Sequence, residues 1–264
     1  MTEASLDYTT IVVEENGPIR TIVLNRPERR NALSPQMQLE LIEAFEEAAA
    51  SSCRVIVLTG AGKAFCAGLD LAALESMKDA TPLDHRAEAE RVVRLFLTLH
   101  ELPVPTIAAV HGAAIAGGCG LATICDFTLA TPSAKFGFTE VRIGFIPALV
   151  SAFVTLQVGD KQSRDLLLTG RIFGAEEALQ LGLVNEIVPQ EKLAGHVQAL
   201  AETLIANSPQ SLAATKQLMA AQHKQWLDAA IVAGIEASIE ARETPDFREG
   251  IAAFLGKRKP AWTK

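Results

Sequence analysis

The sequence has 264 residues and a formal net charge of −7, with 49% hydrophobic and 21% charged residues. This balance is typical of a globular protein with a sizeable core and excludes disorder over most of the chain. An acidic surface repels a phosphate backbone, so nucleic acid is a poor candidate for the main partner.

The first half of the chain predicts strands that alternate with helices. Residues 9–24 indicate two strands joined by a turn at Asn16-Gly17-Pro18. Ser34-Pro35 then opens a helix, because serine caps free amide groups and proline suits the first helical position. The wholly apolar run 55–58 predicts a strand covered on both faces. A helix over 85–101 and strands over 106–110 and 127–130 continue the pattern, which predicts an α/β fold with parallel crossovers.

From about residue 190 the sequence becomes alanine-rich and helical in period, without strands. Ser208-Pro209 and Thr244-Pro245 each have the pattern of a helix cap followed by a first-turn proline. We therefore predict a core over residues 1–190 and a helical region over residues 191–264. Helices that cannot bury all their apolar surface alone are expected to pack on a neighbouring subunit.

The chain has no uninterrupted apolar run long enough to span a bilayer, so no membrane partner is expected. Its first residues, MTEASLDYTT, lack the basic and then apolar pattern of a secretory signal. The four cysteines have neither zinc-ribbon nor CxxC spacing, and none of the five histidines has metal-ligand spacing. We expect a cytoplasmic protein with reduced thiols and no bound metal.

Two glycine-rich turns are the first chemical candidates. Residues 63–70, KAFCAGLD, follow the buried strand and precede a helix, where ligands of α/β proteins collect. Residues 111–121 place paired glycines at a helix start, where backbone amides carry the positive end of the helix dipole. Taken singly, the first turn is better explained as an ordinary strand-to-helix turn capped by Asp70 than as a binding site. For the second turn, close helix packing is as good an explanation as ligand binding.

The third candidate is Glu140 in the apolar segment 136–144. Desolvation there would raise its pKa toward that of a useful base, although alone it is more simply a first-turn acid after a Thr139 cap. The order of the three segments changes this assessment. Two turns with free amides could converge on one carbonyl oxygen and hold the oxyanion of an enolised thioester, while the carboxylate moves the adjacent proton.

The sequence resembles the enoyl-CoA hydratase/isomerase (crotonase) superfamily over nearly its whole length. No single matching stretch is decisive, but together and in this order they are specific. They are Asn25-Arg26-Pro27, Arg30-Asn31-Ala32-Leu33, Ala67-Gly68-Leu69-Asp70, Gly117-Gly118 with Asp126, Leu168-Thr169-Gly170-Arg171, Ala175-Glu176-Glu177-Ala178, Gly182-Leu183-Val184, and Glu249-Gly250-Ile251 with Phe254 and Lys257-Arg258.

The resemblance implies a spiral of ββα units with a C-terminal helical region that builds a homotrimer, often paired into a homohexamer. It implies an oxyanion hole formed by the backbone amides of Leu69 and Gly117, with Glu140 as the catalytic carboxyl. The implied substrate is an acyl-CoA thioester, with CoA as part of the substrate and no separate cofactor. The residues implied to bind the CoA-bearing substrate are Arg30, Ala32, Ala67, Gly68, Asp70, Gly118 and Lys257.

The sequence departs from the family's two-glutamate hydratases at Gly120, which replaces the first glutamate and can transfer no proton. Members with only the second glutamate include Δ3,Δ2-enoyl-CoA isomerases and bacterial hydratases of branched glutaconyl-CoA thioesters in leucine and terpenoid breakdown. Residues 139–151 are more similar to the second group, because the glycine-rich run of straight-chain hydratases is absent.

We therefore expect a 2-enoyl-CoA hydratase of fatty-acid or leucine breakdown, with 3-methylglutaconyl-CoA as one candidate substrate. Arg142 lies near enough in sequence to meet a second substrate carboxyl, although an exposed helix arginine is the simpler interpretation. An isomerase with Glu140 as sole base is one alternative. A non-catalytic or RNA-associated binding protein is another, against which the negative charge argues.

Overall fold

The computed structural model describes residues 8–263. The first seven residues, which carry most of the segment tested for a secretory signal, lie outside the described part. Within residues 8–263, no helix is both long enough and apolar enough to cross a membrane. The four cysteines are buried and unpaired.

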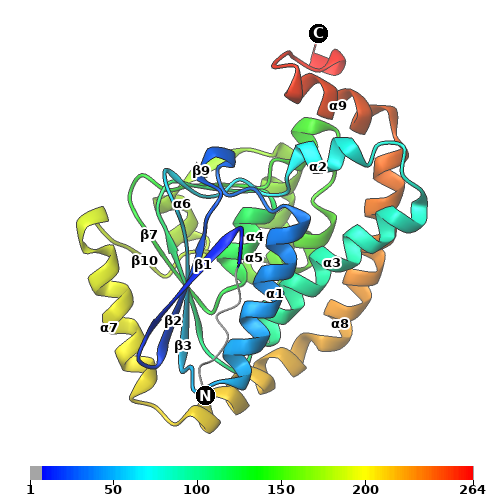
Figure 1. The fold of residues 1–264 in the computed structure, drawn as a ribbon. Helices are drawn as coiled ribbons and strands as arrows, with labels where there is room; N and C mark the ends of the chain where they lie inside the picture. Colours follow the sequence, from blue (N-terminus) through cyan, green and yellow to red (C-terminus); the bar gives the residue numbers. More distant parts are fainter. Residues whose placement is uncertain (1–7, 264) are drawn as a thin grey trace.

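A six-stranded sheet forms one layer of the molecule (Figure 1). Its first two strands form the expected antiparallel hairpin, and every later pairing in this sheet is parallel. In spatial order the strands are β1 (Ile11–Asn16), β2 (Ile19–Leu24), β3 (Val55–Gly60), β5 (Thr106–Val110), β7 (Phe127–Ala130) and β10 (Glu186–Ile187).

The predicted burial of β3 on both faces is confirmed, and successive residues divide between two cores. Ile56 and Leu58 belong to the main core, whereas Val55 and Val57 pack in a second cluster with residues of α7 (Leu193–Ile205). Alternate side chains of a strand point to opposite faces, so a strand with both faces covered can be apolar throughout.

A second, four-stranded sheet is built from strands of three residues. In order they are β4 (Ala64–Cys66), β6 (Ala113–Ile115), β8 (Lys135–Gly137) and β9 (Ile172–Gly174), and only β9 is antiparallel to its neighbour. The chain places β3, β5 and β7 in the first sheet and their successors β4, β6 and β8 in the second, each pair preceding a helix. This is the spiral of ββα units that the resemblance implied.

Helix starts follow the predicted caps. The Ser34 hydroxyl accepts a hydrogen bond from the Met37 amide, and Ser208 and Thr244 cap later helices in the same way. The helix predicted from residue 85 begins earlier, at a capping box of Thr81 and Asp84.

Besides α7, the helices are α1 (Pro35–Ala50), α2 (Leu71–Ser76), α3 (Pro82–Glu101), α4 (Gly117–Ile124), α5 (Ala148–Thr169), α6 (Ala175–Gln180), α8 (Pro209–Glu243) and α9 (Pro245–Leu255). The short 3-10 turns are η1 (Pro27–Arg29), η2 (Glu140–Ile143), η3 (Gln190–Lys192) and η4 (Ala261–Thr263).

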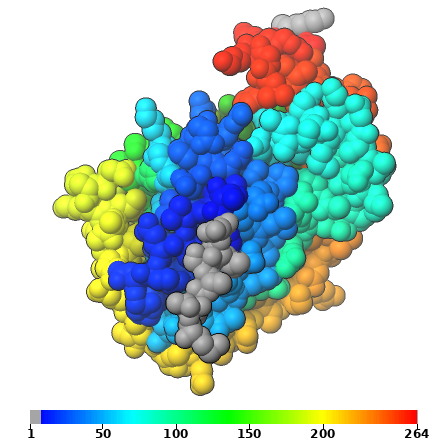
Figure 2. All heavy atoms as spheres, in the orientation of Figure 1, coloured from blue at the N-terminus to red at the C-terminus, as the bar shows by residue number. Residues whose placement is uncertain are grey.

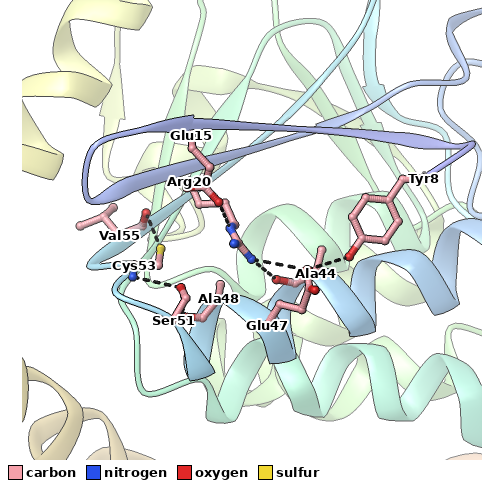
Figure 3. A network of polar contacts seen from close by, with 9 residues as sticks. All are labelled: Tyr8, Glu15, Arg20, Ala44, Glu47, Ala48, Ser51, Cys53 and Val55. Carbon is pink, nitrogen blue, oxygen red and sulfur yellow. Dashed lines mark hydrogen bonds and ion pairs between the residues drawn. The ribbon is translucent and has the colours of Figure 1, made fainter. Parts of the chain in front are cut away.

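Polar contacts fasten the N-terminal hairpin to α1 (Figure 3). The Arg20 guanidinium lies 2.5 Å from Glu15 across the hairpin and donates to the Ala44 carbonyl oxygen of α1 at 3.2 Å. The Tyr8 hydroxyl donates to Glu47 of α1 at 3.0 Å. The edge of the larger sheet is thereby held against the helix that covers it.

The last three helices take different positions. Helix α7 covers one face of the larger sheet, α8 lies along α3 and α5, and α9 contacts α2 and η2. The C-terminal segment, red in Figure 2, projects from the body beside the cyan residues around α2. Backbones meet directly there, because a Cβ added at Gly250 would lie 2.1 Å from the Ile143 carbonyl oxygen. Helix α9 is therefore docked on the segment that carries Glu140.

Candidate active site

Three neighbouring strands bring the three predicted segments together. Because β4, β6 and β8 are parallel, the residues that follow them meet at one edge of the small sheet. Leu69, Gly117 and Glu140 come from these three segments, and all three line one cavity of about 440 Å³. The fold thus brings together three residues, of which the first and last are 71 positions apart in the sequence.

The turns after β4 and β6 touch each other. A Cβ at Gly68, where φ is +87°, would lie 2.9 Å from Ala116 Cβ and 3.3 Å from the Gly117 nitrogen. Leu69 is held by its neighbours, since the Leu33 amide donates to the Gly68 carbonyl oxygen at 2.8 Å. Within residues 8–263 the amides of Leu69 and Gly117 donate no hydrogen bond. Two free donors therefore lie on adjacent turns at the cavity.

Ala116 adopts an unusual backbone conformation just before the second donor, with φ 53° and ψ −127°. A non-glycine residue in such a region costs on the order of 1–3 kcal/mol and persists only where its surroundings hold it. Here the Ala116 amide donates to the Gly137 carbonyl oxygen of β8 at 2.7 Å. This bond fixes the turn that leaves Gly117 as the first residue of α4, with its amide unpaired.

Glu140 begins the 3-10 turn η2 and is buried, with 8% of its surface exposed. Thr139 makes no side-chain cap there, so Glu140 is not a solvated acid in a capped helix turn. Burial raises the pKa of the Glu140 carboxyl from 4.5 to about 7. Its Oε2 has no hydrogen-bond partner within residues 8–263. A carboxyl with this pKa can take up or release a proton near neutrality.

The residues predicted to bind CoA divide between the cavity wall and its support. Arg30 and Ala67 line the cavity, whereas Ala32, Gly68, Asp70, Gly118 and Lys257 do not. Asp70 caps α2 and pairs with Arg26 at 2.9 Å. Gly118 packs on β4, because a Cβ there would lie 2.4 Å from the Cys66 carbonyl oxygen. Their part in binding CoA stays a prediction.

Two further arginines line the cavity together with Arg30. Arg142, interpreted from sequence as an exposed helix residue, is exposed and also faces the cavity. Arg258 lines it too and forms a two-pronged ion pair with Glu249 at 2.5 and 2.8 Å. Lys257 has φ 51°, so the chain turns sharply and brings the next residue to the cavity. Of the pair Lys257-Arg258, the resemblance implied Lys257 as a CoA-binding residue, whereas Arg258 is the one that lines the cavity.

The position of Gly120 has no room for a side chain. A Cβ there would lie 2.6 Å from Val150 Cγ1 and 3.6 Å from Phe96 Cζ. Val150 of α5 thus fills the space that an acid at position 120 would need. Among residues 8–263, Glu140 is the one carboxyl that lines the cavity, and the same residues hold no cluster of three or more possible metal ligands.

Comparisons with known proteins agree with this fold. The family model for enoyl-CoA hydratase/isomerase matches residues 14–264. A Thermus thermophilus protein is 45% identical over 251 residues, 95% of this chain and 99% of its own. The short-chain-enoyl-CoA hydratase of Clostridium acetobutylicum is 31% identical, over 96% of this chain and 97% of its own. The crystal structure of an enoyl-CoA hydratase/isomerase from Xanthobacter autotrophicus Py2 has a TM-score of 0.87 and 31% identity, over 95% of this chain and 97% of that one.

The double sheet, with three parallel strand ends around one cavity, is the crotonase fold. The chain belongs to the enoyl-CoA hydratase/isomerase family and is an enzyme of that family.

The contact between Gly120 and Val150 gives a stability prediction. Gly120→Ala is expected to destabilise the protein by roughly 1–3 kcal/mol, because the new methyl group overlaps Val150. Combining it with Val150→Ala should cost less than the sum of the two single changes, since the second removes the obstruction. Urea unfolding at one fixed protein concentration measures the differences in the free energy of unfolding.

Gly195→Ala is the matched control, because Gly195 lies in helix α7 with nothing within 4 Å of an added Cβ. It should raise the free energy of unfolding by up to about 1 kcal/mol through helix propensity. Equal effects of Gly120→Ala and Gly195→Ala would show that Val150 does not close position 120.

The buried Glu140 predicts a pH-dependent stability. Its pKa of about 7 in the folded protein exceeds the value of 4.5 in the unfolded chain. Between pH 4.5 and pH 7 this carboxyl is therefore ionised in the unfolded chain and still protonated in the folded protein, which favours unfolding as the pH rises. The resulting penalty is absent below pH 4.5 and complete above pH 7, on the order of 3 kcal/mol. Glu140→Gln should therefore gain stability over the wild type as pH rises from about 5 to 8.

Glu249→Gln controls for removal of a carboxylate. Arg258 lowers the pKa of Glu249 to about 2, so both folded and unfolded forms are ionised above pH 5. Its effect on unfolding should be independent of pH over the same range. A Glu140→Gln difference that is equally flat would mean that Glu140 is not protonated near neutrality.

Proposed function

We propose that the protein hydrates a 2-enoyl-CoA thioester with Glu140 as the sole carboxyl. The observation that carries the proposal is a buried carboxyl with a pKa near 7 in the same cavity as two free backbone amides. The names of relatives such as the short-chain-enoyl-CoA hydratase of Clostridium acetobutylicum support the reaction class. The arginines at the cavity suit the phosphates of a CoA ester.

In the proposed reaction the ionised Glu140 accepts a proton from water as the water oxygen bonds to C3 of the enoyl group. The electron pair of the C2–C3 double bond moves toward the thioester and forms an enolate. The amides of Leu69 and Gly117 stabilise its oxygen, where negative charge develops. Protonated Glu140 then returns the proton to C2. Atoms and charge balance without a further cofactor, and CoA enters as part of the substrate.

For the acyl group, we propose a branched chain such as that of 3-methylglutaconyl-CoA, which would place the enzyme in leucine breakdown. The glycine-free stretch after Pro147 supports this choice, because Leu149 and Val150 add apolar side chains to the cavity wall.

Gly120 and Val150 favour a second candidate, Δ3,Δ2-enoyl-CoA isomerisation. That reaction needs one base, which takes a proton from C2 of a 3-enoyl thioester and returns it to C4. A cavity in which Val150 fills the space beside position 120, and in which Glu140 is the single lining carboxyl of residues 8–263, meets this requirement.

We further propose that the enzyme works in the cytoplasm as a homotrimer or a pair of trimers. Large apolar side chains stay exposed on the C-terminal helices, which is unusual for a monomer. They are Leu218, Met219, Trp226 and Val232 of α8, and Phe254 and Leu255 of α9. Buried unpaired thiols suit a reducing compartment.

The proposed assembly predicts a mass of three or six chains by light scattering. Leu218, with 63% of its surface exposed, offers a test. Leu218→Asp should shift the assembly toward monomers, because a buried unpaired charge is costly at an apolar interface. A wild-type monomer at micromolar concentration would contradict the proposal.

Product masses test the reaction. Crotonyl-CoA, 3-methylglutaconyl-CoA and a 3-enoyl-CoA are incubated with the enzyme, and a gain of one water from either of the first two is expected. Glu140→Gln should lower the hydration rate at least a hundredfold, because general acid–base transfer contributes about that much. Unchanged mass with a moved double bond in the third substrate would identify an isomerase instead. Full hydration by Glu140→Gln, with the assembly intact, would remove Glu140 from the mechanism.

A further inference from the structure

A second buried polar side chain, Ser238 of α8, lines the same cavity as Glu140. None of its surface is exposed, and its hydroxyl has no hydrogen-bond partner within residues 8–263. A buried hydroxyl without a partner loses its hydrogen bonds to water and gains none in return, which is unfavourable. Since this one borders a cavity, a bound molecule is the available source of the missing bond.

Several other helix hydroxyls of this chain donate to a backbone carbonyl oxygen of the preceding turn. Ser163 donates to the Gly159 carbonyl oxygen at 2.8 Å, and Thr203 and Thr215 donate to the carbonyl oxygens four residues before them. Such a bond to the preceding turn is the usual solution for serine and threonine within a helix. Ser238 does not make it, so its hydroxyl is left available to the cavity.

The neighbours of Ser238 along α8 place it in the inner wall. Residues 234, 238 and 242 lie on one face of α8, four residues apart. Gly234 packs closely against the start of α5, because a Cβ added at Gly234 would lie 2.8 Å from the Ala148 carbonyl oxygen. Arg242 lies with its guanidinium carbon 5.3 Å from the Phe145 ring centre. Ala148 and Phe145 both line the cavity, so Ser238 faces it between them, where α8 lies along α3 (Figure 1).

The rest of this wall is apolar. It includes Val92 and Phe96 of α3 and Leu149 and Val150 of α5, all buried. The nearby cation of Arg242 does not enter the cavity, because it pairs with the buried Glu88 behind the Phe145 ring. The lining arginines are all exposed and belong to the mouth. Two side-chain hydroxyls line the cavity in the described part of the chain, Ser238 and the half-buried Thr139 next to Glu140. Ser238 is the one that is fully buried and set in the apolar inner wall.

We propose that the Ser238 hydroxyl binds an oxygen substituent on the acyl chain of the substrate and selects such acyl groups over hydrocarbon groups of the same shape. This inference rests on the proposed hydratase function and adds a specificity residue to it. A hydroxyl can donate to a carboxylate, an amide or a keto oxygen, so the recognised chemistry is an oxygen acceptor remote from the thioester. A purely hydrocarbon chain leaves the hydroxyl unpaired, which is how a polar site rejects an analogue.

The test compares three acyl-CoA esters of one shape. They are 3-methylglutaconyl-CoA, the amide of its terminal carboxyl, and the analogue with an isopropyl group in place of that carboxyl. For wild-type enzyme kcat/KM should be higher for both oxygen-bearing esters than for the isopropyl analogue. Ser238→Ala should lower the ratio of oxygen-bearing to hydrocarbon kcat/KM about tenfold, the effect of one good hydrogen bond. Equal loss for carboxylate and amide would identify a neutral acceptor as sufficient, and loss for the carboxylate alone would identify the acid as the ligand.

Ser163→Ala is the matched control, because it also removes a buried helix hydroxyl, but one bonded to its own backbone and outside the cavity lining. It should leave the selectivity ratio unchanged. A ratio equally unaffected by Ser238→Ala would overturn the inference while hydration itself stands. If wild-type enzyme hydrates none of the three esters and not crotonyl-CoA either, the proposed function fails first.

Discussion

The parallel pairing of β4, β6 and β8 is the constraint on which the cavity depends. These strands have three residues each, yet they align three chain segments so that their carboxyl ends share one edge. The small sheet follows the larger one, because each short strand continues from a long strand that is buried on both faces. Packing of the large sheet therefore sets the positions of two amides and one carboxyl.

The cavity combines features that oppose stability. Ala116 holds a strained conformation, and Glu140 is buried with an unpaired oxygen. Both persist because the backbone around them is tightly fixed, by the bond from Ala116 to β8 and by the glycine contact between α9 and η2. The same burial brings the pKa of Glu140 to the range where one carboxyl can serve as base and then as acid. Burial of Glu140 thus both lowers local stability and brings its pKa near neutrality.

Side-chain volumes and hydrogen-bonding groups divide the cavity by function. Val150 occupies the space beside Gly120, so Glu140 is the carboxyl that lines the cavity in the described part of the chain. Arginines gather at the exposed mouth, where a CoA phosphate could stay partly hydrated, while Arg242 is kept behind Phe145 and paired with Glu88. Ser238 places a buried hydroxyl among the apolar side chains of the inner wall, which is the basis of its proposed role in the choice of acyl group.

Elements whose signals lie in neighbouring residues could be predicted from the amino-acid sequence. The hairpin, the serine and threonine caps, the doubly buried β3 and the order of the glycine turns could all be predicted, since each depends on neighbouring residues or on a period of two or 3.6. The family resemblance singled out Leu69, Gly117 and Glu140. The remaining features depend on contacts between distant segments, which leave no local signal. The strands of the small sheet are too short to show a pattern of their own. The burial of Glu140, the filling of position 120 by Val150 and the placement of Arg258 at the cavity mouth all arise from such contacts.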